Sequence, residues 1–98
     1  MHVLSKRRLQ EFWHRHPAAE APLRAWHAMM RGKRYGHPHE LRADFPAASL
    51  LGEGRTVFNI GGNKYRLVVT MRYDMGRVFV RHVVTHAEYD RLAMAGAL

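Results

Sequence analysis

The sequence predicts an α+β fold, in which two amino-terminal helices pack on a small antiparallel sheet and a further helix follows the sheet. Apolar residues recur at helical spacing in the first third of the chain, and they alternate, as in strands, from residue 55 to residue 84. The chain has 98 residues, of which 47% are hydrophobic. We therefore expect one domain, residues 1–98, with a single core.

A short strand and a helix are expected at the amino terminus. His2 to Leu4 is apolar at its centre and predicts a strand. Ser5, a favourable N-cap residue, precedes a helix that ends before Pro17. The apolar stripe of this helix consists of Leu9, Phe12 and Trp13.

A second helix is expected from about Ala21 to Gly32. Pro22 falls in its first turn, where a missing N–H costs little, and glycine commonly ends a helix. Its inward-facing residues are expected to be Leu23, Trp26 and Met30. Because Trp13 and Trp26 both fall in apolar stripes, core packing explains them better than stacking on bases.

The segment from Gly32 to Pro46 is rich in Gly and Pro, which indicates a loop with one short turn around His39 to Ala43. Lys33 and Arg34 lie at the start of this loop. A basic cluster beside a glycine suits contact with phosphates, and a solvated surface without a partner is the alternative.

Three antiparallel strands are expected near residues 55–61, 63–73 and 77–84, where the apolar period is two. Gly61 and Gly62 are a strong signal for a two-residue hairpin turn, because both positions can take a positive φ. Such a turn pairs Asn59 with Lys64.

A second two-residue turn is expected at Met75-Gly76. It places Thr70 opposite Arg81 and Arg66 opposite Thr85. With this register, the residues expected in the core from strands 63–73 and 77–84 lie on the same face of the sheet.

The alternation assigns two faces to this sheet. The residues expected on the core face are Tyr65, Leu67, Val69, Met71, Val78, Val80, His82 and Val84. The residues expected on the open face are Lys64, Arg66, Thr70, Arg72, Arg77, Phe79, Arg81 and Thr85. The open face is therefore strongly cationic.

The last helix is expected to begin at His86. Thr85 and Glu88 have the spacing of a capping box, in which the side chain of each residue accepts a hydrogen bond from the backbone N–H of the other. His86 and Tyr89 lie three residues apart and therefore share one face of the helix.

The charge of the chain favours a polyanionic partner, first of all nucleic acid. Sixteen Lys and Arg against eight Asp and Glu give a formal net charge of +8 and a sequence pI of about 10.9. No apolar run is long enough to span a bilayer and the amino terminus lacks the core of a signal peptide, so a cytoplasmic protein without a membrane partner is expected.

Thiol and metal chemistry are not expected. The chain has no cysteine, which excludes disulfides and thiolate metal sites. None of its eight histidines falls in the two-plus-two pattern of a structural zinc site, so no metal and no cofactor is expected.

The open sheet face and the last helix carry the groups needed to cut RNA through its own 2′-hydroxyl. That reaction needs a base, cations for the charge on the phosphorane, and an acid for the leaving 5′-oxygen. Arg66 and Arg81 are forked phosphate donors, and Lys64 is a point charge. His86 supplies an imidazole, the side-chain type most often used for acid–base chemistry, and Tyr89 is suited to relay a proton or stack on a base.

Each of these residues also has an ordinary structural interpretation. Lys and Arg on an open sheet face are usually solvated, and a histidine that begins a helix is often a surface residue. Tyr89 is equally suited to dock the last helix. The residues expected to bind RNA around the catalytic group are Asn59, Asn63, Lys33, Arg34, Arg72 and Arg77.

Two spaced motifs carry a resemblance to a known family. FNIGGNKYRLVV, followed by VFVRHVVTHAEYDRL, resembles the HigB-type toxins of bacterial toxin–antitoxin modules, which belong to the RelE-like group of mRNA interferases. The order of elements is similar over essentially the whole chain. By similarity, one motif holds Asn63, Lys64 and Arg66, and the other holds Arg81, His86 and Tyr89.

The resemblance implies a RelE-like fold and a metal-independent endoribonuclease that cuts mRNA in the decoding site of the ribosome. It also implies contacts with ribosomal RNA and inhibition by an antitoxin, commonly a helix-turn-helix protein. RelE-like sites vary in which residue is the base and which is the acid, so both assignments stay open for His86.

Two other classes of function are compatible with the residues alone. One is a non-catalytic nucleic-acid-binding module whose cationic sheet follows phosphates. The other is an interaction protein whose basic surface binds an acidic partner.

Overall fold

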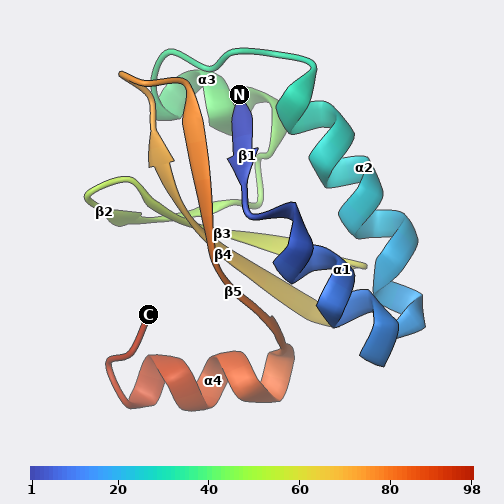
Figure 1. Cartoon of the computed structure of the whole chain (residues 1–98). Coiled ribbons are helices and arrows are strands. Elements are labelled where there is room, and N and C mark those ends of the chain that lie inside the picture. Colours follow the sequence, from blue (N-terminus) through green and yellow to red (C-terminus); the bar gives the residue numbers. More distant parts are fainter.

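A five-stranded mixed sheet forms the centre of the molecule, with strand order β1-β5-β4-β3-β2. The computed structural model describes residues Met1–Leu98 (Figure 1). The elements are β1 (His2–Leu4), α1 (Lys6–Arg15), the 3-10 turn η1 (Pro17–Ala19), α2 (Glu20–Arg31), α3 (Pro38–Asp44), β2 (Ser49–Gly52), β3 (Arg55–Ile60), β4 (Tyr65–Arg72), β5 (Arg77–Thr85) and α4 (His86–Met94). The predicted α+β class is confirmed.

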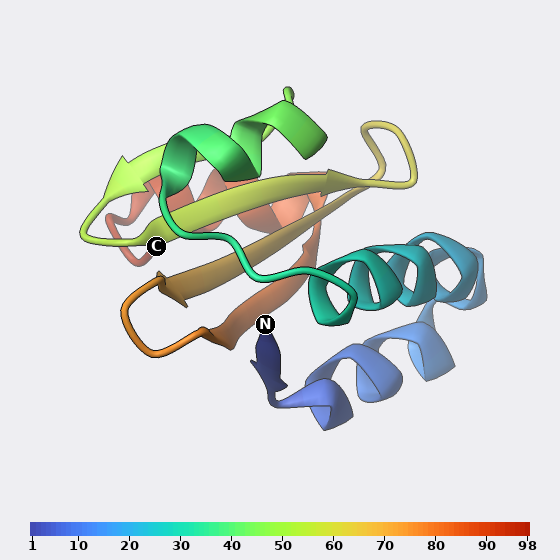
Figure 2. The same cartoon turned by 90° about the horizontal axis from the view of Figure 1, so that it is seen from above.

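The core lies between one face of the sheet and helices α1, α2 and α3, while α4 lies apart from these helices (Figures 1 and 2). Trp13 and Trp26 are 6% and 3% exposed, which confirms their predicted core role. The ring centroid of Trp26 lies 5.5 Å from that of Phe58 in an edge-on contact. The sheet contributes Leu67, Val69, Met71, Val78 and Val80 to this core.

The helix boundaries follow the predicted signals. Ser5 is the N-cap of α1, although its side chain makes no capping hydrogen bond, and α1 ends before Pro17. Gly32 is the C-cap of α2. The short turn predicted in the following loop is the helix α3, which buries Leu41.

Two features of the sheet differ from the predicted meander. Strand β1 pairs with β5 in parallel, so the sheet is mixed and not wholly antiparallel. Strand β2 was not predicted, because all four of its residues are exposed and no alternation marks them. It pairs with β3 at the edge of the sheet.

The predicted two-residue turn at Gly61-Gly62 is wrong. Ile60 pairs with Tyr65, so four residues, 61–64, connect β3 and β4, and the partner of Asn59 is Arg66 instead of Lys64. The carbonyl of Lys64 accepts a hydrogen bond from the N–H of His86 at 3.1 Å. Lys64 therefore supports the start of α4, and the register moves by two residues without exchanging the faces.

The second predicted turn is also too short. Arg72 pairs with Arg77, so residues 73–76 form a four-residue connection. Thr70 lies opposite Phe79, and not opposite Arg81 as predicted. The N–H of Met75 donates to the carbonyl of Arg72 at 3.2 Å, which closes this turn one pair earlier than expected.

A β-bulge in β5 corrects the predicted faces of this strand. Val69 pairs with Val80 and Val68 pairs with His82, so Arg81 is the extra residue. Beyond the bulge the alternation is inverted. His82 and Val84 therefore leave the predicted core face, and Val83 packs against the core in their place.

The same inversion affects the end of the strand. Arg66 lies opposite Val84 instead of Thr85, and Thr85 pairs with Tyr65 on the core side. The phenol ring of Tyr65 packs edge-on against Phe12, with ring centroids 5.4 Å apart.

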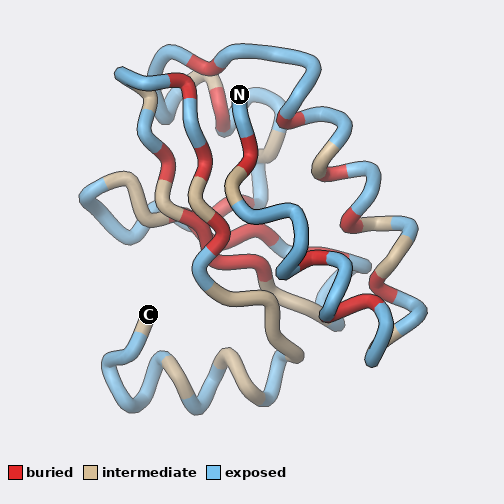
Figure 3. Tube along the Cα trace, in the orientation of Figure 1, coloured by how far each residue is buried: buried red, intermediate tan, exposed pale blue.

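Helix α4 is held mainly at its two ends. Figure 3 shows no buried residue along it, in contrast to α1 and α2. The capping box of Thr85 and Glu88 fixes its start, as predicted. Beyond its other end, the carbonyl of Leu98 accepts a hydrogen bond from the guanidinium of Arg55 on β3. None of the helices combines the length and the hydrophobicity that a membrane-spanning helix needs.

Candidate functional site

Six of the predicted site residues gather where β4 begins and α4 starts. We call them the Arg66 cluster: Asn59, Asn63, Lys64, Arg66, His86 and Tyr89. The cluster combines the end of β3, the connection that follows it, the start of β4 and the first turn of α4. The prediction that Arg66 and His86 lie at the same end of the sheet is therefore confirmed, although the predicted register was wrong.

Arg66 is half-buried at the centre of this cluster. Asn59 on β3 and Val84 on β5 are its cross-strand partners, so all three side chains point to the same face of the sheet. Its Nη1 donates to the carbonyl oxygens of Asn63 at 3.1 Å and Tyr65 at 3.2 Å. No protein acceptor takes Nε or Nη2, which leaves two donors of the fork for an anion.

Tyr89 connects α4 with Arg66. The Cζ atom of Arg66 lies 5.9 Å from the centroid of the Tyr89 ring, within the range of a cation–π contact. The ring is half-buried. Both interpretations of Tyr89 from the sequence therefore remain compatible with its position, because it docks α4 and also lies beside the free donors of Arg66.

His86 is exposed on the first turn of α4 and is paired with a carboxylate. Its Nδ1 lies 3.1 Å from Oδ2 of Asp90, one helical turn further on. Asp90 was not among the predicted site residues, although its spacing of four from His86 would have identified the contact. Asp90 orients the imidazole ring so that Nε2 is directed away from the pair and is open to a ligand.

The capping box sets the position of this helical turn. The N–H of Thr85 donates to Oε1 of Glu88 at 2.9 Å, and the N–H of Glu88 donates to Oγ1 of Thr85 at 3.2 Å. The bond from the Thr85 N–H is the main cause that lowers the pKa of the Glu88 carboxyl, so Glu88 is a stable anion at neutral pH. The start of α4 is therefore firmly placed beside β4.

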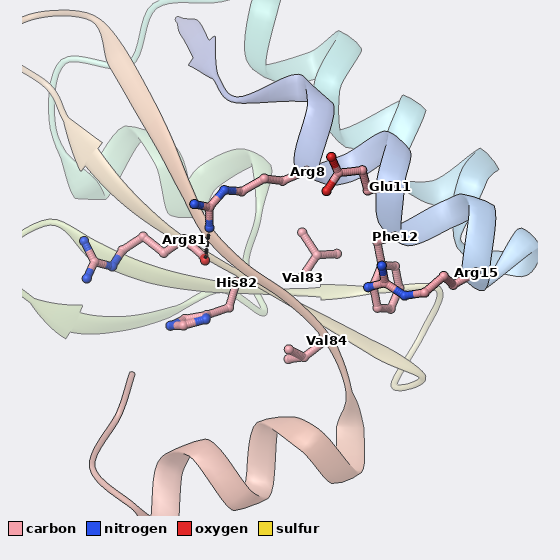
Figure 4. Close-up of a pocket in the computed structure, with 8 residues that line it drawn as sticks. All are labelled: Arg8, Glu11, Phe12, Arg15, Arg81, His82, Val83 and Val84. Atoms are coloured by element: carbon pink, nitrogen blue, oxygen red, sulfur yellow. Dashed lines mark hydrogen bonds between the residues drawn. The ribbon is translucent and has the colours of Figure 1, made fainter.

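Arg81 does not belong to the Arg66 cluster. It is the bulged residue of β5, its side chain is exposed, and its carbonyl accepts a hydrogen bond from Nη1 of Arg8 at 2.9 Å. Figure 4 shows the side chains of Arg81 and His82 on the same side of β5. Arg8 was not predicted as a site residue, because nothing in the sequence places α1 beside β5.

Four predicted RNA-binding residues lie at the opposite end of the sheet. Arg72 and Arg77 are cross-strand partners beside the connection 73–76, about 20 Å along β4 from Arg66. Arg72 also forms an ion pair with Asp74 at 3.1 Å. Near this end, Nη2 of Arg34 reaches the carbonyl oxygens of Tyr73 at 3.5 Å and Asp74 at 3.3 Å, and Lys33 forms an ion pair with Asp44 at 3.2 Å.

The Arg66 cluster has the groups that act on phosphate esters. It offers two free guanidinium donors, a lysine ammonium, an imidazole and a phenol within one end of the sheet. No three His, Asp or Glu side chains converge in a group that could hold a metal ion. Arg66 and Lys64 supply the positive charge that this cluster offers to a phosphate.

Comparison with known proteins identifies the family. Residues 19–92 match the family model described as HigB_toxin, RelE-like toxic component of a toxin-antitoxin system. The chain is 29% identical over 94 residues to the mRNA interferase HigB of Escherichia coli O6:H1 (strain CFT073), which covers 94% of this chain and 91% of the relative. It is 28% identical over 92 residues to the mRNA interferase toxin HigB of Escherichia coli K12, with 92% and 88% covered.

The mRNA interferase HigB of Shigella flexneri matches to the same extent, with 28% identity over 92 residues. The matched residues of the family model include β3, β4, β5 and the first turns of α4, and so contain every residue of the Arg66 cluster. This chain belongs to the HigB family, the RelE-like toxic components of toxin–antitoxin systems.

Proposed function

We propose that this toxin is an endoribonuclease that cuts translated mRNA in the cytoplasm, without a metal ion and only on the ribosome. The observation that carries the proposal is the Arg66 cluster, in which a half-buried guanidinium with two free donors lies beside Tyr89, at the end of the sheet where His86 begins α4. The names of the HigB relatives, mRNA interferases, support it.

The proposed reaction uses the 2′-hydroxyl of the substrate as the nucleophile. A base takes the 2′-hydroxyl proton, the O2′–P bond forms, the P–O5′ bond breaks, and an acid protonates the leaving 5′-oxygen. The products are a 2′,3′-cyclic phosphate and a 5′-hydroxyl. Each half of this proton transfer is a general acid–base step.

The residues of the cluster have distinct roles in this proposal. Arg66 directs Nε and Nη2 at the non-bridging oxygens of the scissile phosphate, where negative charge develops. Lys64 holds the adjacent backbone as a point charge. His86, oriented by Asp90, acts as the base or the acid and works together with Tyr89.

Arg81 and the remaining predicted residues bind RNA outside the scissile phosphate. Arg81 lies on β5 at the bulge, so it suits a phosphate next to the scissile one. Asn59 and Asn63 flank Arg66 and contact the bound nucleotides. The distant residues Lys33, Arg34, Arg72 and Arg77 then contact ribosomal RNA.

The exposure of the cluster supports dependence on the ribosome. His86, Lys64 and Asn63 are all exposed to solvent. Alignment of the reacting groups supplies a large part of a catalytic rate, and an exposed site gains alignment when a larger assembly holds the RNA. We also infer that the cognate antitoxin is a helix-turn-helix protein, as the resemblance of the two motifs implies.

Mapping of mRNA 5′ ends after induction in a bacterial host tests the function. The wild-type chain should produce new ends confined to translated regions, while Arg66→Ala and His86→Ala should produce none. Arg42→Ala is the control, because Arg42 is exposed on α3 and lies outside the cluster.

A parallel assay with purified components tests the need for ribosomes. The wild-type protein should cut an mRNA that is being translated and leave the same naked mRNA intact. Absence of new ends from the wild-type protein would reject the nuclease and favour a non-catalytic RNA-binding module. Cleavage of naked mRNA at the same rate would reject only the ribosome dependence.

A further inference from the structure

A second cationic site lies in a groove between α1 and β5, on the far side of β5 from Arg66. It has a volume of about 360 Å³. Four basic residues line it, together with Val83 and Val84: Arg8 and Arg15 come from α1, and Arg81 and His82 come from β5. Figure 4 shows that the side chains of Arg81 and His82 extend on the side of β5 away from α1. We call this hollow the α1–β5 groove.

The groove exists because β5 lacks a strand partner along most of one edge. Strand β1 pairs with β5 only as far as Phe79, and α1 runs beside the residues that follow. The bulge at Arg81 lies where this pairing ends. The edge of the sheet is thus lined by a helix with basic side chains, and one of its carbonyls, that of Arg81, is already bound by Arg8.

The two arginines of α1 are held in place along the groove. Arg8 is fixed by its bond of 2.9 Å to the carbonyl of Arg81, and the Cζ atom of Arg15 lies 5.8 Å from the ring centroid of Phe12. Both remain exposed. The single acid of the groove, Glu11, is paired with Arg7 at 3.1 Å, so the positive charge of the groove is not cancelled.

The groove continues toward the Arg66 cluster. A neighbouring hollow shares His82 and Val84 with it and is completed by Glu88, Arg91 and Leu92 of α4. Val84 is also the cross-strand partner of Arg66. A chain molecule that leaves Arg66 can therefore enter the α1–β5 groove by crossing a single strand.

We propose that the α1–β5 groove binds the ribose-phosphate backbone of one RNA strand that runs past the Arg66 cluster. The proposal rests on the proposed function and extends its site. Arg8 and Arg15 are seven residues apart on one helix, or about 10 Å, which is about three nucleotides of a stacked strand. In Figure 4, Arg15 lies at the end of the groove nearer to α4, and Arg8 lies toward the other end, where it binds the carbonyl of Arg81.

An extended acidic peptide is the competing ligand, because a free sheet edge also accepts a strand. Three observations favour RNA. The positive charges are spaced along the whole groove instead of being gathered at one point, and the groove leads to a cluster suited to phosphate chemistry. Arg8 also occupies the Arg81 carbonyl that a peptide strand would need.

Fluorescence anisotropy with a short 5′-fluorescein single-stranded RNA tests the proposal. Its riboses carry 2′-O-methyl groups, so binding is measured without cleavage. The double variant R8E/R15E should bind at least tenfold more weakly than the wild type. Its plot of log affinity against log salt should be less steep by about 1.4, since each lost phosphate contact removes about 0.7.

The control is the double variant R24E/R42E, which changes the net charge by the same amount. Arg24 and Arg42 are exposed on α2 and α3, outside the groove. The control should keep the wild-type salt slope. Equal losses in both double variants would show that only overall charge matters and would overturn the proposal.

Ribosome pelleting identifies the source of the strand. If R8E/R15E fails to bind both vacant and mRNA-carrying ribosomes, the groove binds ribosomal RNA. If R8E/R15E binds vacant ribosomes normally and loses only the additional binding that mRNA provides, the groove binds the substrate. Normal RNA binding by R8E/R15E, together with failure to bind the antitoxin, would overturn the proposal in favour of a peptide site. If RNA binding is lost in R8E/R15E but the wild-type protein cuts no mRNA, the proposed nuclease activity is rejected and the proposed RNA-binding groove is still supported.

Discussion

The guanidinium of Arg66 lies 5.9 Å from the centre of the Tyr89 ring and joins the middle of the sheet to the last helix. Arg66 is anchored through one nitrogen to two backbone carbonyls, so its remaining donors keep a fixed direction. Tyr89 belongs to a helix without a buried residue. This contact is therefore one of the few that place α4 over the sheet.

Arg66→Lys should lower mRNA cleavage by about 10²-fold or more. A lysine keeps the charge but cannot bind two carbonyls and a phosphate in one plane. The measurement is single-turnover cleavage of a translated mRNA, with thermal unfolding to verify the fold. A lysine variant that retains full activity would show that charge alone is required at this position.

Tyr89 permits its two roles to be separated. Tyr89→Phe keeps the ring over Arg66, whereas Tyr89→Ala removes it, at a cost of about 0.5–2 kcal/mol for a half-buried contact. If the hydroxyl takes part in proton transfer, both variants lose cleavage while only the alanine variant loses stability. Unfolding and cleavage measured on the same preparations distinguish this result from a purely packing role, in which Tyr89→Phe stays active.

Thr85→Ala should destabilise the protein by about 1 kcal/mol, because it removes the cap that fixes the start of α4. Hydrogen exchange should become faster in the first turn of α4, where His86 is located. Thr85→Ser is the matched control, since it keeps the hydroxyl that accepts from Glu88. Equal stability of the alanine and serine variants would contradict the assigned cap.

Stability should fall as the pH drops below about 6.5. Burial lowers the pKa of His82 and of His27, and neighbouring cations lower each further: Arg81 and Arg8 act on His82, and Lys6 and Arg31 act on His27. Both histidines therefore take up a proton more readily in the unfolded chain. Acidification through this range favours unfolding until the folded protein is protonated as well.

Urea unfolding between neutral and mildly acidic pH measures this effect. His82→Asn should reduce the pH dependence, while replacement of the exposed His39 by Asn should leave it unchanged. NMR titration should place the pKa of His82 below that of an ordinary histidine. A higher value would contradict the burial described for this ring.

Gly54 should be far less tolerant of alanine than Gly52, although both have positive φ angles, of 80° and 95°. A Cβ at Gly54 would lie 2.4 Å from the carbonyl oxygen of Met71, whereas a Cβ at Gly52 would meet nothing within 4 Å. Gly54→Ala should therefore cost at least about 1 kcal/mol more in unfolding free energy. Similar losses in the two variants would indicate that the backbone angle alone is limiting.

The helices could be predicted from the sequence because their ends depend on local chemistry. Pro17, Gly32 and the pair Thr85 and Glu88 act through neighbouring residues, and each marks the boundary that the structure has. The apolar stripes with Trp13 and Trp26 were equally reliable, since a helix buries one continuous face. Strand β2 has neither kind of signal and was missed.

The registers could not be predicted, because they depend on contacts between distant segments. The carbonyl of Lys64 is taken by His86, which lengthens the connection after β3. The bulge at Arg81 lies where β1 stops pairing with β5 and where Arg8 approaches from α1. For the site, Arg66, His86 and Tyr89 were brought together by the order of elements, whereas Arg8 and Asp90 were missed.

The bulge at Arg81 also determines how this strand can change during evolution. It divides β5 into two segments of opposite parity, because Arg81 is an extra residue between Val80 and His82. The loss of Arg81 would therefore leave His82 outward and Val83 inward in an unbroken alternation, whereas the loss of a regularly paired residue between the bulge and α4 would exchange the faces of all the strand residues that follow it. The bulge is thus the place where β5 can change its length by one residue and keep its two faces.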